Sequence, residues 1–159
     1  MSITNCHICD YENDTSQDGL FCVICGADFS NPGSESKIME NKTRGTYATS
    51  DKISDLRKEA FIYLTNQRLV LVPADVEYQG LGMTGALTAA VAQTIWSSLT
   101  SGQPSLISIK LKDVKTIRDG KFGLLVKALI VETTDGHMVK FTAPKIKEWK
   151  GALTKAAGI

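Results

Sequence analysis

The chain has 159 residues, 43% of them hydrophobic, and a formal net charge of +1, which suits one globular domain or a domain with a small appendage. The charge is uneven: residues 1–36 hold six acidic and no basic residues, whereas residues 37–159 hold 18 basic and 11 acidic ones, a difference of +7. This asymmetry predicts an acidic N-terminal unit on a basic body. Because an acidic unit repels phosphate, we do not expect nucleic acid as its partner.

All the cysteines lie near the N-terminus, as Cys6, Cys9, Cys22 and Cys25, with the spacing C-x2-C-x12-C-x2-C. Each C-x2-C pair can form a tight knuckle, and two knuckles supply the four tetrahedral thiolates that Zn(II) favours. Four ligands leave no open position for substrate, so we predict a structural zinc ion rather than a catalytic one. Residues 1–30 are too few to fold on an apolar core alone, so the metal would supply most of their folding free energy.

Two other uses of these cysteines stay open. One C-x2-C pair is compatible with a redox centre, and two disulfides are compatible with a secreted chain. Residues 1–10 lack the basic and apolar regions of a secretory signal. We therefore expect a reducing compartment, a cytoplasmic location and a metal site.

The stretch FCVICGADF resembles short N-terminal zinc-ribbon fingers. Gly26 follows the last cysteine, where a knuckle often needs a positive φ. Phe21 and Phe29 flank the second pair and are expected to form the small apolar core of the finger. His7, between two ligands, is expected to be a solvated knuckle residue.

The finger also partly resembles ubiquitin-binding zinc fingers. That family has Asn four residues after its second cysteine, and Asn13 occupies this position. Thr4 stands where the family has Trp, and Asp10–Tyr11 replaces Thr–Phe. The resemblance implies recognition of a ubiquitin-like protein as one alternative.

The sequence after the finger indicates a linker followed by a hairpin. Residues 31–36 form a Ser/Pro/Gly-rich linker. Lys37–Asn41 and Arg44–Thr49 are weak strand candidates. In EAFIYLTNQRLVLVPA, an apolar run at 61–64 and another at 69–72 flank a polar turn, which predicts a β-hairpin that Pro73 ends.

Residues 80–103 form a Gly/Ala/Thr-rich insertion within an uncharged stretch, Gln79–Ile109. It can form a helix with an apolar stripe, and three roles stay open: covering the open side of a barrel, self-association, or insertion at a membrane interface. The candidate interface residues are Leu87, Val91, Ile95, Trp96 and Leu99.

The rest of the chain predicts four strands and one helix. SLISIKLKDV alternates apolar and polar residues, which is typical of a half-buried strand. The further strands are predicted at Val114–Arg118, Phe122–Thr133 and His137–Thr142, with turns at Asp119–Gly120 and Asp135–Gly136.

The predicted C-terminal helix begins at Pro144, a favoured first helical position. Ile146, Trp149, Leu153 and Ala156 fall on one stripe of this helix. We therefore expect Trp149 to plug the core.

This order of elements resembles a pleckstrin-homology-like (PH-like) barrel capped by a C-terminal helix. YLTNQRLVLV is similar to the hairpin of GRAM-type and bacterial PH-like domains, and LKDVKTI and LIVETTDGHMVKFTAP resemble their later strands. The resemblance implies a mainly β (α+β) domain at 37–159, Glu40 opening its first strand, and a binding or assembly module.

Two basic groups are candidates for binding an anionic ligand. Lys42, Arg44 and Lys52 lie near the first strand connection, where phosphoinositide-binding PH domains carry basic residues. Lys110 and Lys112 are expected on one face of their strand. A solvated strand face is the alternative. Arg68, at the hairpin corner, is expected to bind turn carbonyls.

The pattern G-x-x-x-x-G-K-[ST] does not occur, and no nucleophile motif accompanies the two His. We therefore expect a non-enzymatic binding or scaffolding module that acts by protein–protein contact or self-assembly. The first alternative is a peripheral adaptor for anionic membranes. Ubiquitin-like protein or nucleic-acid binding through the finger is a further alternative.

Overall fold

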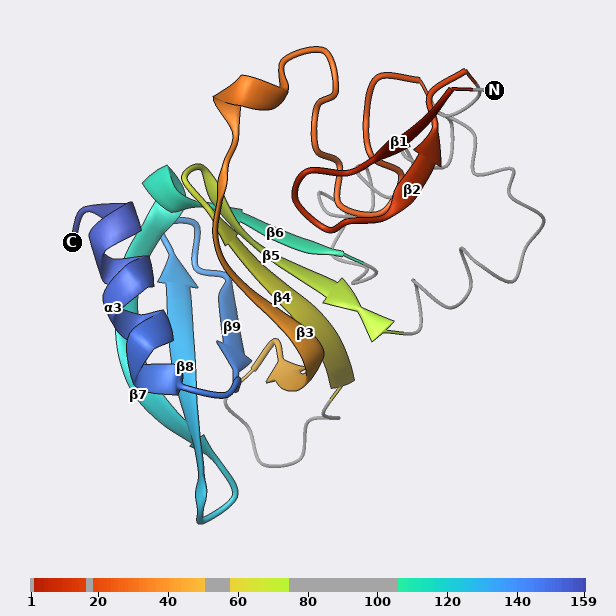
Figure 1. Ribbon diagram of the computed structural model, residues 1–159. Helices are drawn as coiled ribbons and strands as arrows, with labels where there is room; N and C mark the ends of the chain where they lie inside the picture. The colour runs from red at the N-terminus through yellow and green to blue at the C-terminus, as the bar shows by residue number, and fades with distance from the viewer. Residues whose placement is uncertain (1, 17–18, 51–57, 75–105) are drawn as a thin grey trace.

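The computed structural model describes residues 2–16, 19–50, 58–74 and 106–159. These residues form a mainly β protein with antiparallel sheets and a C-terminal helix (Figure 1). A small two-stranded sheet joins β1 (Ile3–Asn5) to β2 (Glu12–Asp14) in the finger. Among the described residues no helix is long and apolar enough to cross a membrane.

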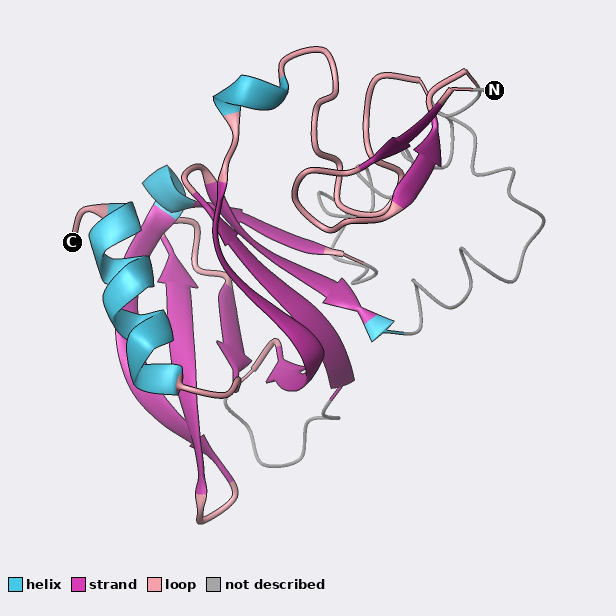
Figure 2. Ribbon diagram, viewed as in Figure 1, coloured by secondary structure: helices cyan, strands magenta, loops and turns pink. Residues whose placement is uncertain are grey.

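The large sheet has seven strands in the order β6-β5-β4-β3-β9-β8-β7, and Figure 2 shows it as the main layer of the molecule. Its strands are β3 (Lys37–Ala48), β4 (Lys58–Thr65), β5 (Arg68–Pro73), β6 (Ile107–Lys110), β7 (Val114–Phe122), β8 (Val126–Thr133) and β9 (Met138–Phe141).

Strand β3 replaces the two weak strands expected near the linker. It is continuous, with register shifts against β4 between Lys37 and Met39 and between Asn41 and Gly45. Its far end, Tyr47 and Ala48, pairs with β9. One irregular strand therefore connects the two halves of the sheet, and its irregularities explain why no clean alternation marks it in the sequence.

The β4–β5 hairpin is confirmed, and its strands are buried on both faces of the sheet. Leu69 and Leu71 join the core on one face, and Val70 and Val72 join the core on the other. A strand covered on both sides reads as a continuous apolar run instead of an alternating one. This double burial accounts for the LVLV sequence.

One face of the sheet is covered by α3 (Ile146–Ala157). Trp149 and Leu153 are buried, and the ring of Trp149 meets that of Phe141 edge-on, with 6.0 Å between centroids. The predicted stripe and core plug are confirmed. The predicted start at Pro144 is wrong, because Lys145 has a left-handed φ of 58° and the helix begins after it.

The turn between β7 and β8 lies later than predicted. Asp119 and Gly120 are paired with Leu129 and Ala128 inside the ladder, and the chain reverses after Phe122. Gly120 serves close packing: a Cβ there would meet Cδ1 of Ile130 at 2.7 Å. The Asp-Gly pair is therefore part of a strand, and the reversal falls at residues 123–125.

Strand β6 ends at Lys110, earlier than the alternating pattern suggests. Leu111–Asp113 form the 3-10 helix η2, and Leu111 is buried in it. The expectation that Lys110 and Lys112 share one strand face is therefore wrong, because Lys112 lies in a helical turn.

Candidate metal centre

The two cysteine pairs form matching knuckles. In the first, the amide of Asp10 donates to the carbonyl of Cys6 at 2.9 Å; in the second, the amide of Gly26 donates to that of Cys22 at 2.8 Å. Asp10 and Gly26 have left-handed φ values of 62° and 72°. Glycine and aspartate both tolerate this conformation, so each residue that follows a knuckle lets the chain turn around its two sulfurs.

The four sulfur atoms converge on one point. The Sγ atoms of Cys6 and Cys25 are 3.5 Å apart, those of Cys9 and Cys22 are 3.6 Å apart, and all four lie within 4.8 Å of one another. A tetrahedral site with Zn–S bonds of about 2.3 Å would place its sulfurs about 3.8 Å apart. All four cysteines are free thiols, so the cluster can hold a metal ion and contains no disulfide.

N–H groups around the sulfur atoms stabilise negative charge on them. The amide of Ile8 donates to Sγ of Cys6 at 3.4 Å, and the Asn13 side-chain amide lies 3.7 Å from Sγ of Cys22. Asn13 also accepts from the amide of Val23 at 3.1 Å and is buried. Asn13, the residue shared with ubiquitin-binding fingers, therefore connects β2 to the second knuckle and is buried there.

The thiols influence one another strongly. Hydrogen bonding with Cys25, and then with Cys6 and Cys9, lowers the pKa of the Cys22 thiol. The same interaction with Cys22 raises the pKa of Cys25. Within the set the pKa is lowered for Cys22 and Cys6 and raised for Cys25 and Cys9. The closely spaced thiols therefore resist losing all their protons unless a cation offsets the charge.

Arg68 links this cluster to the sheet. Its Nη1 donates to the carbonyl of Cys25 at 2.7 Å, and its Nε and Nη2 donate to the two carboxylate oxygens of Glu35 at 2.6 and 3.2 Å. Burial alone would lower the pKa of Arg68, but the hydrogen bonds and charge of Glu35, followed by the charges of Cys25 and Cys6, raise it. The prediction gave Arg68 the carbonyls of its own turn as partners, whereas the carbonyl that it binds belongs to the finger.

The predicted linker is bonded to the hairpin turn. Thr65 donates to Glu35 at 2.8 Å, Asn66 accepts from the amide of Ser36 at 2.8 Å, and Gln67 donates to the carbonyl of Ser34 at 2.5 Å. Before this contact the chain forms the 3-10 helix η1 (Pro32–Ser34). Each residue of the TNQR turn thus holds the segment between finger and sheet. Glu35 was not among the functional residues predicted from the sequence. It is the single acidic residue in a segment of small polar residues, which is a weak indication of a role.

The finger covers the second face of the sheet at β4 and β5. Ile8, Val23 and Ile24 of the knuckles share a buried core with Val70 and Val72. Tyr63 and Leu106 complete this core from the sheet side, and Figure 1 shows the finger lying against β5 and β6. The finger and the sheet are therefore packed together, and the metal site lies beside their contact.

Two expectations about individual finger residues are wrong. Phe21 is 47% exposed, whereas Phe29 packs against the shared core, because that core is built from the knuckles and the sheet. His7 is half-buried, and its Nε2 is buried without a hydrogen-bond partner among the described residues, so its ring is not a solvated one.

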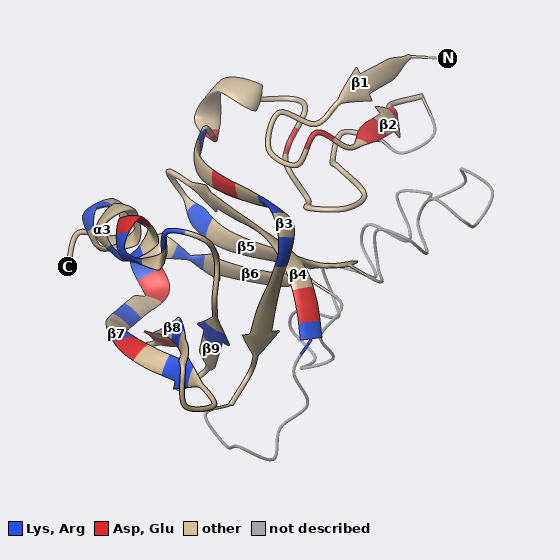
Figure 3. Cartoon of the chain, turned by 60° about the horizontal axis from the view of Figure 1, so that its bottom comes forward, with Lys and Arg blue, Asp and Glu red and all other residues tan. Residues whose placement is uncertain are grey.

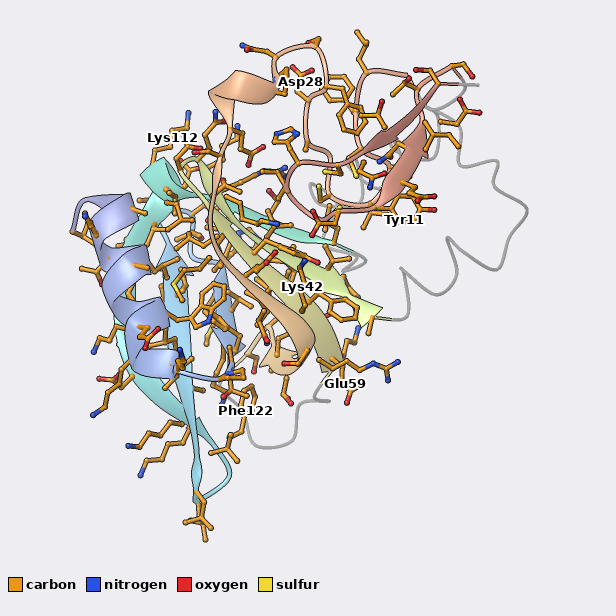
Figure 4. The ribbon with its side chains drawn as sticks, in the orientation of Figure 1. Tyr11, Asp28, Lys42, Glu59, Lys112 and Phe122 are labelled. Atoms are coloured by element: carbon orange, nitrogen blue, oxygen red, sulfur yellow. The ribbon has the colours of Figure 1, made fainter. Side chains whose placement is uncertain are left out.

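Lys42 and Arg44 of the first basic group are paired with carboxylates of the same chain. Lys42, labelled in Figure 4, lies 2.8 Å from Asp10 of the finger and 3.6 Å from Glu40. Arg44 lies 3.3 Å from Glu59. The acidic finger thus docks on the basic body of its own chain.

The remaining candidates lie on two elements of the sheet region or outside the described residues. Lys110 and Lys112 are both exposed. Lys110 is the last residue of β6, and Lys112 lies in η2. Lys52 and the candidate interface residues Leu87, Val91, Ile95, Trp96 and Leu99 lie outside the described residues.

No family model matches the sequence. No curated protein matches it either. The crystal structure of the C-terminal domain of an unknown protein from Leishmania infantum is similar to this chain, with a TM-score of 0.51 and 13% identity over 82% of this chain and 92% of that chain. At this identity the likeness shows a shared fold alone.

Proposed function

We propose that this chain is a non-enzymatic binding or scaffolding module in which a structural zinc ion, held by Cys6, Cys9, Cys22 and Cys25, keeps the finger folded on the sheet. The observation that carries the proposal is the burial of the cluster: Cys6, Cys22 and Cys25 are each at most 1% exposed, and the knuckles pack on the sheet. Four buried protein ligands fill all four coordination positions of a tetrahedral metal ion, which is typical of a structural site.

Zinc suits this donor set better than harder cations do, because four thiolates are soft ligands; iron is the main competitor for tetrahedral sulfur. A tetrathiolate zinc site carries a net charge of −2. Arg68 supplies a buried positive charge beside it. Because Glu35 already pairs with this guanidinium, Arg68 offsets the charge of the site only in part. A zinc ion lacks the redox chemistry that iron would bring.

The architecture we propose is PH-like. Seven antiparallel strands in one meandering sheet, followed by an amphipathic helix that covers one face, support this assignment. Among the described strands no ladder joins β6 to β7, so the sheet has two edges there. In this proposal, as in PH-like domains generally, the domain binds its partner through surface residues and has no set of catalytic residues.

The proposed partner is a protein, or a second copy of this chain, in the reducing environment of the cytoplasm. The uncharged segment 80–103 is the proposed contact, on the strength of its sequence. Sedimentation equilibrium of the intact chain and of a chain lacking residues 80–103 tests it. A larger mass for the intact chain alone supports the proposal, and equal monomer masses for both argue against self-assembly.

Anionic-lipid binding through Lys42 and Arg44 receives no support from the geometry, since both have carboxylate partners within the chain. Binding to anionic vesicles that is lost when both residues are changed to Glu would restore that alternative.

Elemental analysis of the purified chain tests the metal. One zinc per chain, retained through gel filtration and without thiol–disulfide turnover, is the expected result. A metal-free chain with an ordered N-terminal finger, or an iron site that changes oxidation state, would contradict the structural-zinc assignment.

A further inference from the structure

The tip of the β7–β8 hairpin carries the two large apolar side chains with the highest exposed fractions among the described residues. Leu124 and Leu125 are each 90% exposed, and the adjoining Val126 is 47% exposed. The hairpin projects beyond the body of the molecule, on the side away from the finger (Figure 1). Single exposed leucines are ordinary on protein surfaces. Two adjacent exposed leucines at a projecting tip form a small apolar patch.

The tip is held by its base. Phe122 and Val126 form the last pair of the ladder, and only residues 123–125 lie between them. Phe122, labelled in Figure 4, is buried against Ala48 and Ala128, and Nζ of Lys140 lies 4.8 Å from the centroid of its ring. The two leucines are therefore presented on a short turn above a packed aromatic ring, so fixing them in a bound state costs little conformational entropy.

Two lysines flank the apolar tip. Lys121 and Lys127 are cross-strand partners, both are exposed, and neither has an ion-pair partner among the described carboxylates. The surrounding region is basic as well: residues 106–159 contain 11 basic and 5 acidic residues, a difference of +6. Figure 3 shows basic positions along β7 and α3.

We propose that this hairpin tip docks on anionic membrane surfaces, with Leu124 and Leu125 inserted at the headgroup–acyl boundary and Lys121 and Lys127 at the level of the anionic headgroups. Apolar side chains that enter the interface, combined with basic residues that attract acidic lipids, are the two contributions that hold peripheral proteins on membranes. Long lysine side chains can keep their charge in the headgroup layer while the turn enters more deeply.

A membrane fits this feature better than a protein surface does. A stable protein interface buries about 800 Å² on each partner, far more than a three-residue turn offers. A fluid interface surrounds a projecting tip on all sides and needs no matching cavity. The acidic finger lies at the other end of the molecule, where its charge does not oppose docking. The inference goes beyond the proposed function, because it requires neither the metal nor the segment 80–103.

Vesicle co-sedimentation of the full-length, metal-loaded chain tests the proposal. The probes are vesicles of phosphatidylcholine alone and vesicles of phosphatidylcholine and phosphatidylserine in equal amounts. We expect binding to the anionic vesicles that falls at least about tenfold in Leu124→Ser/Leu125→Ser. Lys121→Gln/Lys127→Gln is expected to weaken it by about tenfold at low salt and to remove much of its salt dependence.

Leu20→Ser is the matched control, because Leu20 is an exposed leucine, 59% accessible, on the distant finger. It should bind like the unmodified chain, and circular dichroism with zinc content should show that every variant is folded. Failure of the unmodified chain to bind anionic vesicles overturns the proposal. So does equal binding by the double leucine variant. A leucine variant that loses self-association, with no vesicle binding in either form, would assign the tip to a contact between copies instead.

Discussion

Arg68 and Cys25 are 43 residues apart in the chain, yet Nη1 of the arginine donates to the carbonyl oxygen of the cysteine at 2.7 Å. The same guanidinium holds Glu35 through two hydrogen bonds, and the two side chains of this ion pair are only 7% and 9% exposed. One side chain of the hairpin turn therefore connects the metal knuckle, the segment after it and the sheet.

Removing this arginine should separate the finger from the sheet. Arg68→Met removes the donor to the Cys25 carbonyl and leaves the buried Glu35 carboxylate with the Thr65 hydroxyl but without its cation. Loss of one partner of a buried ion pair costs about 3–5 kcal/mol. Urea unfolding of the metal-loaded variant measures the change. Arg44→Gln is the control, because it breaks the exposed pair with Glu59 and should cost less than about 1 kcal/mol. Equal losses in the two variants would contradict the linking role of Arg68.

Metal removal should unfold the finger and leave the sheet–helix core intact. The sheet face under the finger carries Tyr63, Val70 and Val72, so its exposure should increase binding of an apolar dye such as ANS. Hydrogen exchange after chelation should show fast amides in residues 2–30 and continued protection of Ile130 and Val131 in β8. Cys22→Ser should behave like the chelated chain, and added zinc should reverse the effect of chelation only. Protected finger amides in the metal-free chain would refute this prediction.

Two glycines should respond with opposite signs to the same substitution. In Gly120→Ala the new Cβ would meet Cδ1 and Cγ1 of buried Ile130 at 2.7 and 2.8 Å, so we expect a loss of about 1–3 kcal/mol. Gly151 lies inside α3 with nothing within 4 Å of an added Cβ, so Gly151→Ala should gain about 0.5–1 kcal/mol. Thermal unfolding of both variants measures the difference. A neutral Gly120→Ala would show that β7 and β8 are not packed this closely.

The Glu132 carboxyl reports on the pairing of β7 with β8. Hydrogen bonds from Arg118, and then from Thr116, lower its pKa. A carboxyl with a depressed pKa in the folded state stabilises the fold above its unfolded pKa, and this contribution is lost as pH falls through the folded value. Arg118→Gln should therefore raise the pKa of Glu132 toward 4.5, as measured by carboxyl chemical shifts against pH. Lys145→Gln removes a pairing with Glu148 and should leave Glu132 unchanged.

The elements that follow from local chemistry were predictable from the sequence. The spacing of Cys6, Cys9, Cys22 and Cys25 determines the two knuckles, because two ligands separated by two residues must turn around one point. The apolar stripe of α3 and the LVLV return strand were equally readable, because side-chain periodicity is a property of the local backbone.

Tertiary structure decided the contacts between segments that are distant in the chain. The sequence contains Arg68, Glu35 and the TNQR turn, but no local rule brings residues separated by more than 30 positions together. The turn at residues 123–125 could not be located from the sequence for the same reason. Asp-Gly is an ordinary turn signal, but here Gly120 pairs with Ala128 in the ladder and its missing side chain leaves room for Ile130. The amino-acid sequence by itself thus determined a four-cysteine finger and a β-rich body with a capping helix. The packing of the finger on the sheet was decided by burial of their shared apolar core, which depends on the whole fold.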